Sequence, residues 1–133
     1  MLTKIHPDTF AVRLNRLFAA IRPPGRGPYT GREVSRRLAN RGVDVSEPYL
    51  SQLRSGQRLR PSPTVVIELA DFFGIRPEYF TDEDPDYTEA LDTELGWLEL
   101  THNPHVRRLT TALLELSPAA REAALRAVTD HHT

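Results

Sequence analysis

The chain has 133 residues, a formal net charge of −1 and no cysteine, so it allows one domain, or one domain with an extension. The lack of cysteine excludes disulfides, thiolate metal sites and a cysteine nucleophile. No segment approaches the roughly 20 consecutive apolar residues of a membrane span, and the first ten residues lack the apolar core of a secretory signal. We therefore expect a soluble cytoplasmic protein.

Charge is divided unevenly along the chain. Residues 1–82 contain 13 Lys and Arg against 8 Asp and Glu, a balance of +5, whereas residues 83–133 contain 4 against 10, a balance of −6. A basic half favours a polyanionic partner, whereas two ordinarily solvated surfaces are the simpler alternative. Charge alone leaves both interpretations open.

Apolar residues that recur every three or four positions predict a first amphipathic helix over about residues 8–21. Prolines and glycines in residues 22–28 then prevent this helix from continuing. A second helix is expected over about residues 31–41, because Thr30 and Glu33 have the spacing of a capping box. The chain is therefore expected to begin with two helices joined by a proline- and glycine-rich loop.

A third helix is expected from Ser46, a favourable N-cap, to about Ser55, since Gly56 follows. Ser62 caps a fourth helix in the same way, and a short helical turn is expected at residues 78–80. No segment shows the alternation that is typical of a strand. The first part of the chain is therefore predicted to be a compact all-α domain, with a glycine-centred turn between its second and third helices.

The C-terminal part of the chain is organised differently. Residues 82–86 form an acidic segment that we expect to be a linker. Leucine stripes then predict a helix over about residues 86–101 and another after Pro104, and an alanine-rich helix follows Pro118. About fifty residues bury little apolar surface by themselves, so these stripes must pack on the first domain or on another copy.

The expected third helix has two different sides. Leu50 and Leu53 form its buried side, and the opposite side is a continuous stripe of short side chains: Pro48, Ser51, Gln52 and Ser55. Serine and glutamine offer hydrogen-bond donors and acceptors without the loss of a full charge, which suits a helix that reads base edges in the DNA major groove. A solvated polar face is the alternative interpretation.

Two residues at the start of this helix join the base-reading candidates. Ser46 precedes the helix, and Glu47 lies in its first turn, where it either accepts from a cytosine amino group or favours the helix N-terminus. The arginines around the stripe are expected to bind phosphates on either side of it and to set its register on DNA. They are Arg32, Arg36, Arg54, Arg58 and Arg60.

The segments TGREVSRRLANRG, VS, PYLSQLRSGQRLRPS and VVIELADFFGI, in this order, resemble the helix-turn-helix of the Cro/CI-type family, also called the xenobiotic-response-element family. Through LDTELGWL, VRRL and LSPAAR, the resemblance to a nucleoid-associated member of this family extends over nearly the whole chain. The resemblance implies a five-helix DNA-binding domain at residues 1–82 and a C-terminal helical dimerisation domain at residues 83–133.

The resemblance also bears on the start of the second helix. Many members of the family carry glutamine directly after the threonine that opens this helix, and that glutamine contacts a phosphate. Here the position is occupied by Gly31. The phosphate contact is therefore expected from backbone N–H groups at Thr30 and Gly31, or from Arg32.

We therefore expect a transcriptional regulator that binds double-stranded DNA at the nucleoid as a homodimer or a higher homo-oligomer. Its subunits are expected to pair through the apolar stripes of the C-terminal domain, at Leu91, Leu95, Trp97, Leu98, Val106, Leu109 and Leu113. The alternative is a protein-interaction or antitoxin-like adaptor module that uses the same fold.

No enzymatic function is indicated by the sequence. His102 and His105 lie three residues apart, but a metal site needs further ligands, and surface histidines are the simpler interpretation. The acids of residues 83–99 come with neither a nucleophile motif nor a glycine-rich phosphate loop. We expect no metal, no cofactor, no membrane association and no small-molecule effector.

Overall fold

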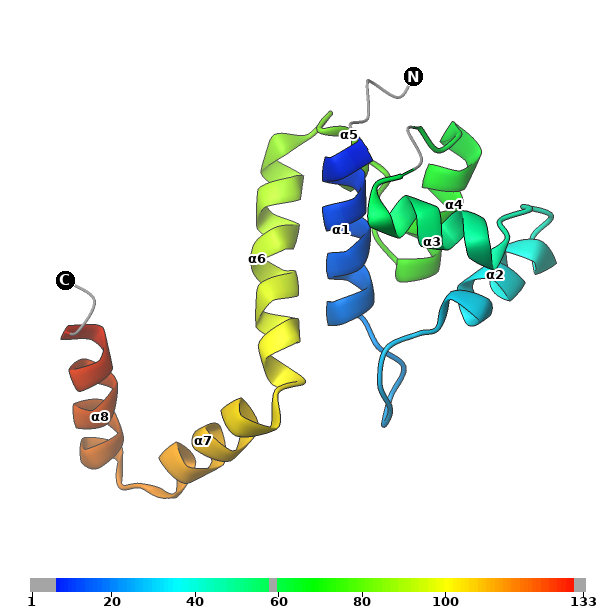
Figure 1. Ribbon diagram of the computed structural model, residues 1–133. Helices are drawn as coiled ribbons and strands as arrows, with labels where there is room; N and C mark the ends of the chain where they lie inside the picture. The colour runs from blue at the N-terminus through cyan, green and yellow to red at the C-terminus, as the bar shows by residue number, and fades with distance from the viewer. Residues whose placement is uncertain (1–6, 58–59, 131–133) are drawn as a thin grey trace. The chain divides into compact units, whose positions relative to one another are not determined.

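A computed structural model describes residues 7–57 and 60–130 of the chain, and every regular element in these ranges is a helix (Figure 1). In chain order the helices are α1 Pro7–Ala20, α2 Gly31–Asn40, α3 Glu47–Ser55, α4 Pro63–Phe73, α5 Glu78–Thr81, α6 Pro85–Thr101, α7 Pro104–Glu115 and α8 Pro118–Asp130. The predicted all-α fold class is confirmed. Within the described ranges, no helix combines the length and the apolar character needed to cross a membrane.

Side-chain caps set the starts of the central helices where the sequence predicted them. Thr30 and Glu33 form a complete capping box, in which each side chain accepts a hydrogen bond from the other residue's backbone N–H, at 3.1 and 2.9 Å. Ser46 and Ser62 cap α3 and α4 in the simpler way, each accepting from a backbone N–H three residues on. Gly56 ends α3 with a φ of 79°, a left-handed conformation that glycine adopts without strain.

The hydrophobic core of the N-terminal part lies where α1 to α5 meet. It contains Leu14 and Leu17 from α1, and two leucines, Leu50 and Leu53, fill it from α3. Each of these side chains is at most 1% exposed, and full burial of a leucine contributes roughly 1.5–3 kcal/mol. Because Leu50 and Leu53 point inward, the opposite side of α3 is presented to solvent.

Helix α6 belongs to the same compact unit as α1 to α5. The chain divides between Glu99 and Leu100 into two units, so the first unit runs past the expected boundary at residue 82. Leu95 is 1% exposed and is part of the core, and Tyr87 and Leu91 pack against it. These three residues recur every four positions, so they form one apolar stripe that covers core surface left open by the preceding helices.

The second unit contains α7 and α8, and its apolar side chains are largely exposed. Within α7 no described residue is buried. Leu109 and Leu114 of α7 are more than half exposed, and so is Val128 of α8. Apolar stripes that remain uncovered to this degree are typical of surfaces that bind another protein.

Candidate nucleic-acid interface

Helix α3 presents the predicted stripe to solvent. Five of the six base-reading candidates are exposed: Ser46, Glu47, Pro48, Ser51 and Ser55. Gln52 is half-buried, and its backbone carbonyl accepts a hydrogen bond of 3.1 Å from the Ser55 hydroxyl. The side chains on this surface are short, so the backbone of α3 can approach another surface closely.

A polar contact with α1 holds α3 in its orientation. Asn15 donates from Nδ2 to the backbone carbonyl of Arg54 at 2.8 Å, and Arg54 donates from Nε to Asn15 Oδ1, also at 2.8 Å. The Arg54 guanidinium lies 3.9 Å from the centroid of the Phe18 ring, within the range of a cation–π contact. Burial lowers the pKa of Arg54 below its usual value, but an arginine remains charged at physiological pH. Arg54 is therefore a partly buried anchor as well as a candidate phosphate ligand.

The start of α2 lies close to α3 and has the features of an anion site. A Cβ added to Gly31 would meet Leu50 Cδ2 at 3.7 Å, which is ordinary van der Waals contact. The first N–H groups of a helix have no acceptor within the helix, and the helix dipole favours an anion beside them. Arg32 is exposed in this first turn. Backbone and guanidinium donors are thus available together at this end of α2.

The loop before α2 is anchored to the same end of the helix. Arg26 donates from both terminal nitrogens to the Glu33 carboxylate, one of these bonds being 2.8 Å long, and also donates to the Pro28 carbonyl. With the Thr30 N–H as a further donor, this arrangement lowers the pKa of Glu33 to about 2. Arg26 is engaged within the protein in this structure and acts as a loop anchor.

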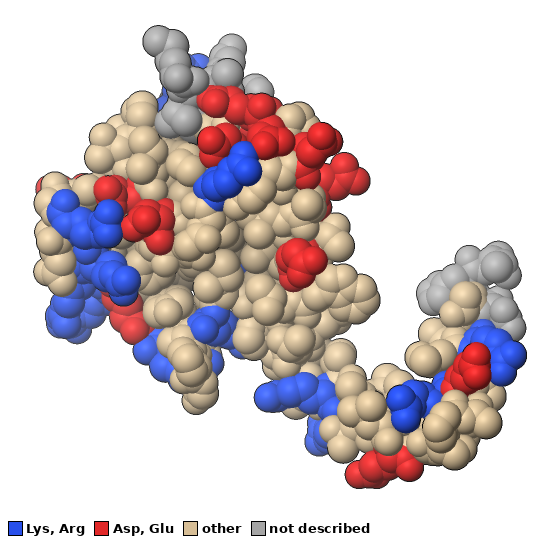
Figure 2. Space-filling view, turned by 180° about the vertical axis from the view of Figure 1, so that it is seen from behind, with Lys and Arg blue, Asp and Glu red and all other residues tan. Residues whose placement is uncertain are grey.

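The remaining residues predicted to bind phosphate are Arg36, Arg58 and Arg60. Arg36 and Arg60 are exposed, and Arg58 lies outside the described residues. Figure 2 shows that the Lys and Arg side chains of the first unit gather on the side where α2 lies, whereas Asp and Glu side chains gather where α5 leads into α6. Basic side chains are therefore concentrated near α2 and acidic ones near the start of α6, although each region also contains the opposite charge, as in the Arg41–Glu68 and Arg76–Asp84 pairs.

The residues predicted to pair subunits differ in how far they are buried within a single chain. Leu95 is buried in the core of the first unit and Leu91 packs against that core, so both are occupied within a single chain. Trp97 and Leu98 of α6 are exposed, at 64% and 43%. On α7, Leu109 is exposed, while two others are half-buried: Val106 and Leu113.

Sequence reasoning missed Asn15. The signal available for it was a polar residue directly after Leu14 and three positions before Phe18, both of which face the core. For the histidines, the described residues contain no group of three or more potential metal ligands.

Two comparisons with known proteins bear on this geometry. A helix-turn-helix family profile matches residues 33–80, which run from the first turn of α2 into α5. The nucleoid-associated protein EspR of Mycobacterium tuberculosis, from strains CDC 1551 / Oshkosh and ATCC 25618 / H37Rv, is 49% identical over 117 residues, or 88% of this chain and 87% of the relative. The similarity to EspR thus extends well beyond the helix-turn-helix segment, and the chain belongs to the EspR family of helix-turn-helix proteins.

Proposed function

We propose that the chain is a nucleoid-associated transcriptional regulator that binds double-stranded DNA with α3 in the major groove. The observation that carries this proposal is the outer side of α3, a stripe of short, exposed polar side chains backed by Leu50 and Leu53. Helix-turn-helix proteins place such a helix against base edges, with its N-terminal residues closest to them. The nucleoid association printed in the name of the EspR relative supports the same function.

In this proposal the α3 side chains read bases by hydrogen bonding. Gln52 is suited to a bidentate contact with adenine, through its amide donor and acceptor. Ser51 and Ser55 lie on the same side of the helix and can donate to or accept from neighbouring bases. Glu47, exposed in the first turn, is suited to accept from a cytosine amino group.

The phosphate contacts are proposed to come from groups around α3. The N–H group at Gly31 offers a helix N-terminus, next to Thr30, whose own N–H donates to the Glu33 carboxylate. The exposed guanidinium groups of Arg32, Arg36 and Arg60 are proposed to flank it. Arg54 is proposed to bind a phosphate through the part of its guanidinium that Asn15 does not engage. Arg58 is also proposed as a phosphate ligand, because it lies in the sequence between α3 and α4, two residues before Arg60.

The protein is further proposed to act as a homodimer. Trp97 and Leu98 on α6 and Leu109 on α7 leave apolar surface exposed on a single chain, and covering such surface favours association. Two-fold pairing of helix-turn-helix units usually places half-sites about 34 Å apart, or a multiple of this distance. A different separation of the two α3 helices would instead allow one dimer to bridge distant sites.

The proposal is tested by fluorescence anisotropy with labelled duplexes at increasing salt. Binding should weaken steeply with salt, because each phosphate contact releases counterions. Gln52→Ala should reduce discrimination between sequences by about 1–3 kcal/mol. Arg60→Ala should weaken all sequences alike and lower the salt slope by about 1.

Arg107→Ala, which removes an exposed arginine from α7, is the matched control and should leave both quantities unchanged. Binding that does not change between low and moderate salt would contradict the proposal. A pull-down that yields one stoichiometric protein partner and retains no DNA would favour the adaptor alternative.

A further inference from the structure

We propose that the arginine-lined groove between α2 and α4 binds the acidic outer side of α6 in a second copy of this chain. This contact extends the proposed function, because copies that bind neighbouring stretches of DNA would be held together side by side. The groove is separate from the α3 stripe and from the exposed apolar side chains proposed to pair subunits, but it shares Arg32 and Arg36 with the proposed phosphate contacts, so Arg37 is the arginine that serves this contact alone.

The groove has a volume of about 290 Å³ and is lined mainly by aromatic and basic side chains. It is lined by Tyr29, Arg32, Glu33, Arg36, Arg37 and Phe72. The Tyr29 and Phe72 rings meet edge-on with centroids 5.0 Å apart, and the Arg37 guanidinium lies 5.6 Å from the Phe72 centroid. An arginine held against a ring keeps a planar guanidinium ready for a carboxylate.

The positive charge of this groove is not neutralised within the described part of the chain. Glu33 is engaged by Arg26, and no other acid lines the groove. Arg32, Arg36 and Arg37 form no ion pair with any described residue, in contrast to Arg41, which pairs with acids of α4. Arg32 and Arg36 are four residues apart on one helix, where like charges repel. An external anionic partner would relieve this repulsion.

The outer side of α6 carries the complementary charge. Asp86, Glu89 and Glu94 are exposed. At 100° per residue Glu89 lies about 60° to one side of Asp86 and Glu94 about 80° to the other, so the three span about 140° of the helix surface. Among the described residues none of the three has a cationic partner. By contrast, Asp82 and Asp92 already pair with arginines of α1.

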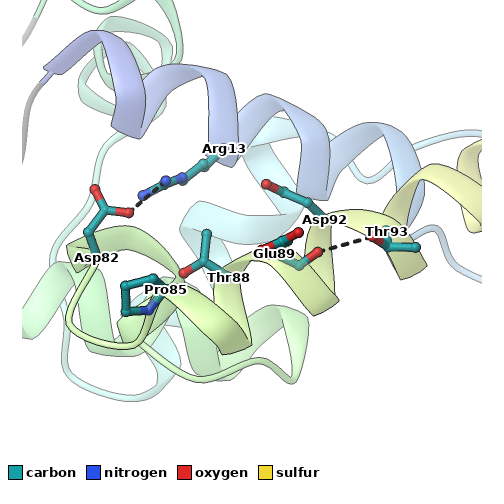
Figure 3. Close-up of a pocket in the computed structure, with 7 residues that line it drawn as sticks. All are labelled: Arg13, Asp82, Pro85, Thr88, Glu89, Asp92 and Thr93. Carbon is teal, nitrogen blue, oxygen red and sulfur yellow. Dashed lines mark hydrogen bonds and ion pairs between the residues drawn. The ribbon is translucent and has the colours of Figure 1, made fainter.

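An open cleft adjoins this acidic side, and Glu89 is one of the residues that line it. The cleft has a volume of about 450 Å³ and is lined by Arg13, Asp82, Pro85, Thr88, Glu89, Asp92 and Thr93 (Figure 3). Arg13 pairs with Asp82 at 2.7 Å toward one end of the cleft, and Thr93 lies at the other end. Glu89 is the lining acid without an ion-pair partner in the described residues, so the cleft has a place for a guanidinium from outside.

A second copy is the partner favoured by the placement of these two surfaces. In the first unit, α6 lies on one side of α1 and α2 lies on the other, so one chain cannot bring them together (Figure 1). The surface likewise has more basic side chains near α2 and more acidic ones where α5 leads into α6 (Figure 2). In a contact between two different surfaces, one end copy keeps a free groove and the other keeps a free acidic side. Further copies can therefore add at both ends, and the assembly grows as a row.

The expected contact is weak in free solution. Exposed ion pairs contribute little and are screened by salt. Copies bound side by side on one duplex have a high effective concentration, and a weak contact is then occupied. The measurable consequence is cooperative binding to a duplex that carries several sites.

The groove residue chosen for the test is Arg37, because Arg32 and Arg36 are also proposed phosphate ligands. Affinity is measured on a short duplex that holds one protein dimer and on a duplex with the same sequence repeated in tandem. The wild-type protein should bind the tandem duplex several-fold more tightly per site. Arg37→Glu and Glu89→Arg should each remove this advantage, and the double variant should restore it at least in part.

Glu99→Arg is the matched control, since Glu99 is an exposed acid of the same helix that lies about 15 Å further along its axis than Glu89. Both Glu89→Arg and Glu99→Arg add positive charge, which by itself favours DNA binding. If Glu89→Arg loses the cooperativity and Glu99→Arg keeps it, the contact is supported. If Arg37→Glu weakens binding to the short and the tandem duplex equally, the groove binds phosphate and the inference is overturned.

A second measurement does not depend on DNA binding. The chain has no cysteine, so an Arg37→Cys protein mixed with a Glu89→Cys protein can form a disulfide only between introduced thiols. A mixed disulfide at low salt, absent when Glu99→Cys replaces Glu89→Cys, supports the contact, and failure to form it overturns the inference. If the wild-type protein binds no duplex, the proposed function fails, and the disulfide experiment still decides this contact.

Discussion

The hydroxyl of Tyr79 donates a hydrogen bond of 2.7 Å to the Asp92 carboxylate, and this bond joins α5 to α6. The same carboxylate pairs with Arg16 of α1 at 2.7 Å. Burial of Tyr79 and its bond to the negatively charged Asp92 raise the pKa of the tyrosine above its usual value. Three helices therefore meet at one carboxylate, next to the buried Leu95.

The first prediction follows from this junction and concerns where the chain can be cut. A chain that ends at Asp84 lacks Asp92 and Leu95, and loss of a buried leucine side chain alone costs about 2–5 kcal/mol. A chain that ends at Thr101 keeps both residues. Urea denaturation followed by circular dichroism should show a much lower midpoint for the shorter chain. Equal midpoints for the two chains would mean that α6 adds nothing to the first unit.

The second prediction concerns pairing of subunits. A chain that ends at Thr101 lacks α7 and α8, which carry much of the exposed apolar surface, including Leu109 and Val128. Light scattering should show a dimer for the full chain and a monomer for the truncated one. A truncated chain that remains fully dimeric would show that α7 and α8 are not needed for pairing and that the α6 part of the surface, at Trp97 and Leu98, is sufficient.

The third prediction concerns Asn15, which holds α3 through Arg54. Asn15→Ala removes two hydrogen bonds and leaves a backbone carbonyl and a partly buried guanidinium without their partner. We expect a loss of about 1–3 kcal/mol in the free energy of unfolding, together with reduced discrimination between DNA sequences. The control is Asn40→Ala, at the exposed end of α2, which should change neither. Unchanged stability in Asn15→Ala would show that the contact does not hold α3.

The fourth prediction concerns pH. The Arg26 guanidinium and the Thr30 N–H lower the pKa of Glu33 from 4.5 to about 2. A group whose pKa is lower in the folded state contributes stability above its unfolded pKa, and this contribution is lost as the pH falls through the folded value. Glu33→Gln lacks the titrating charge but keeps an acceptor for the capping box.

The stability curves of the wild-type and Glu33→Gln proteins should therefore differ above pH 4.5 and converge as the pH falls toward 2. Urea midpoints measured across this range test the expectation. A difference between the two proteins that stays constant across the range would show that the Glu33 charge plays no part in stability.

The fifth prediction compares the same substitution at two glycines. Gly74 ends α4 with a φ of 73°, where an alanine costs about 1–2 kcal/mol. Gly96 lies inside α6, where an added Cβ meets no atom within 4 Å, so alanine should stabilise the helix by about 0.5–1 kcal/mol. Urea midpoints should move in opposite directions for the two variants. Shifts of the same sign would contradict the backbone argument.

Local features of this protein were predictable because they depend on residues that are close in sequence. The Thr30 capping box, the serine caps of α3 and α4 and the glycine that ends α3 follow from side chains within three or four positions. The inward direction of Leu50 and Leu53 follows from helix geometry, and the exposed stripe opposite them follows with it. These features carry the candidate interface.

Contacts between distant residues were not predictable in the same way. Asn15 and Arg54 are 39 positions apart, and no local sequence pattern indicates that the two residues contact each other. The leucine stripe of α6 was compatible with the first domain or with another copy. The structure places Leu95 in the core of its own chain.

The order of residues in this chain by itself determined an all-α fold, the limits of its central helices and the polar outer side of α3. Helix caps, glycine termini and apolar spacing act over single turns, so one segment at a time is enough to predict them. Only the tertiary structure decided that α6 completes the first unit, that Arg54 is held by Asn15 and that α2 and α6 lie on opposite sides of α1. These outcomes depend on which apolar faces pack together, and packing energy is set by the whole set of helices at once.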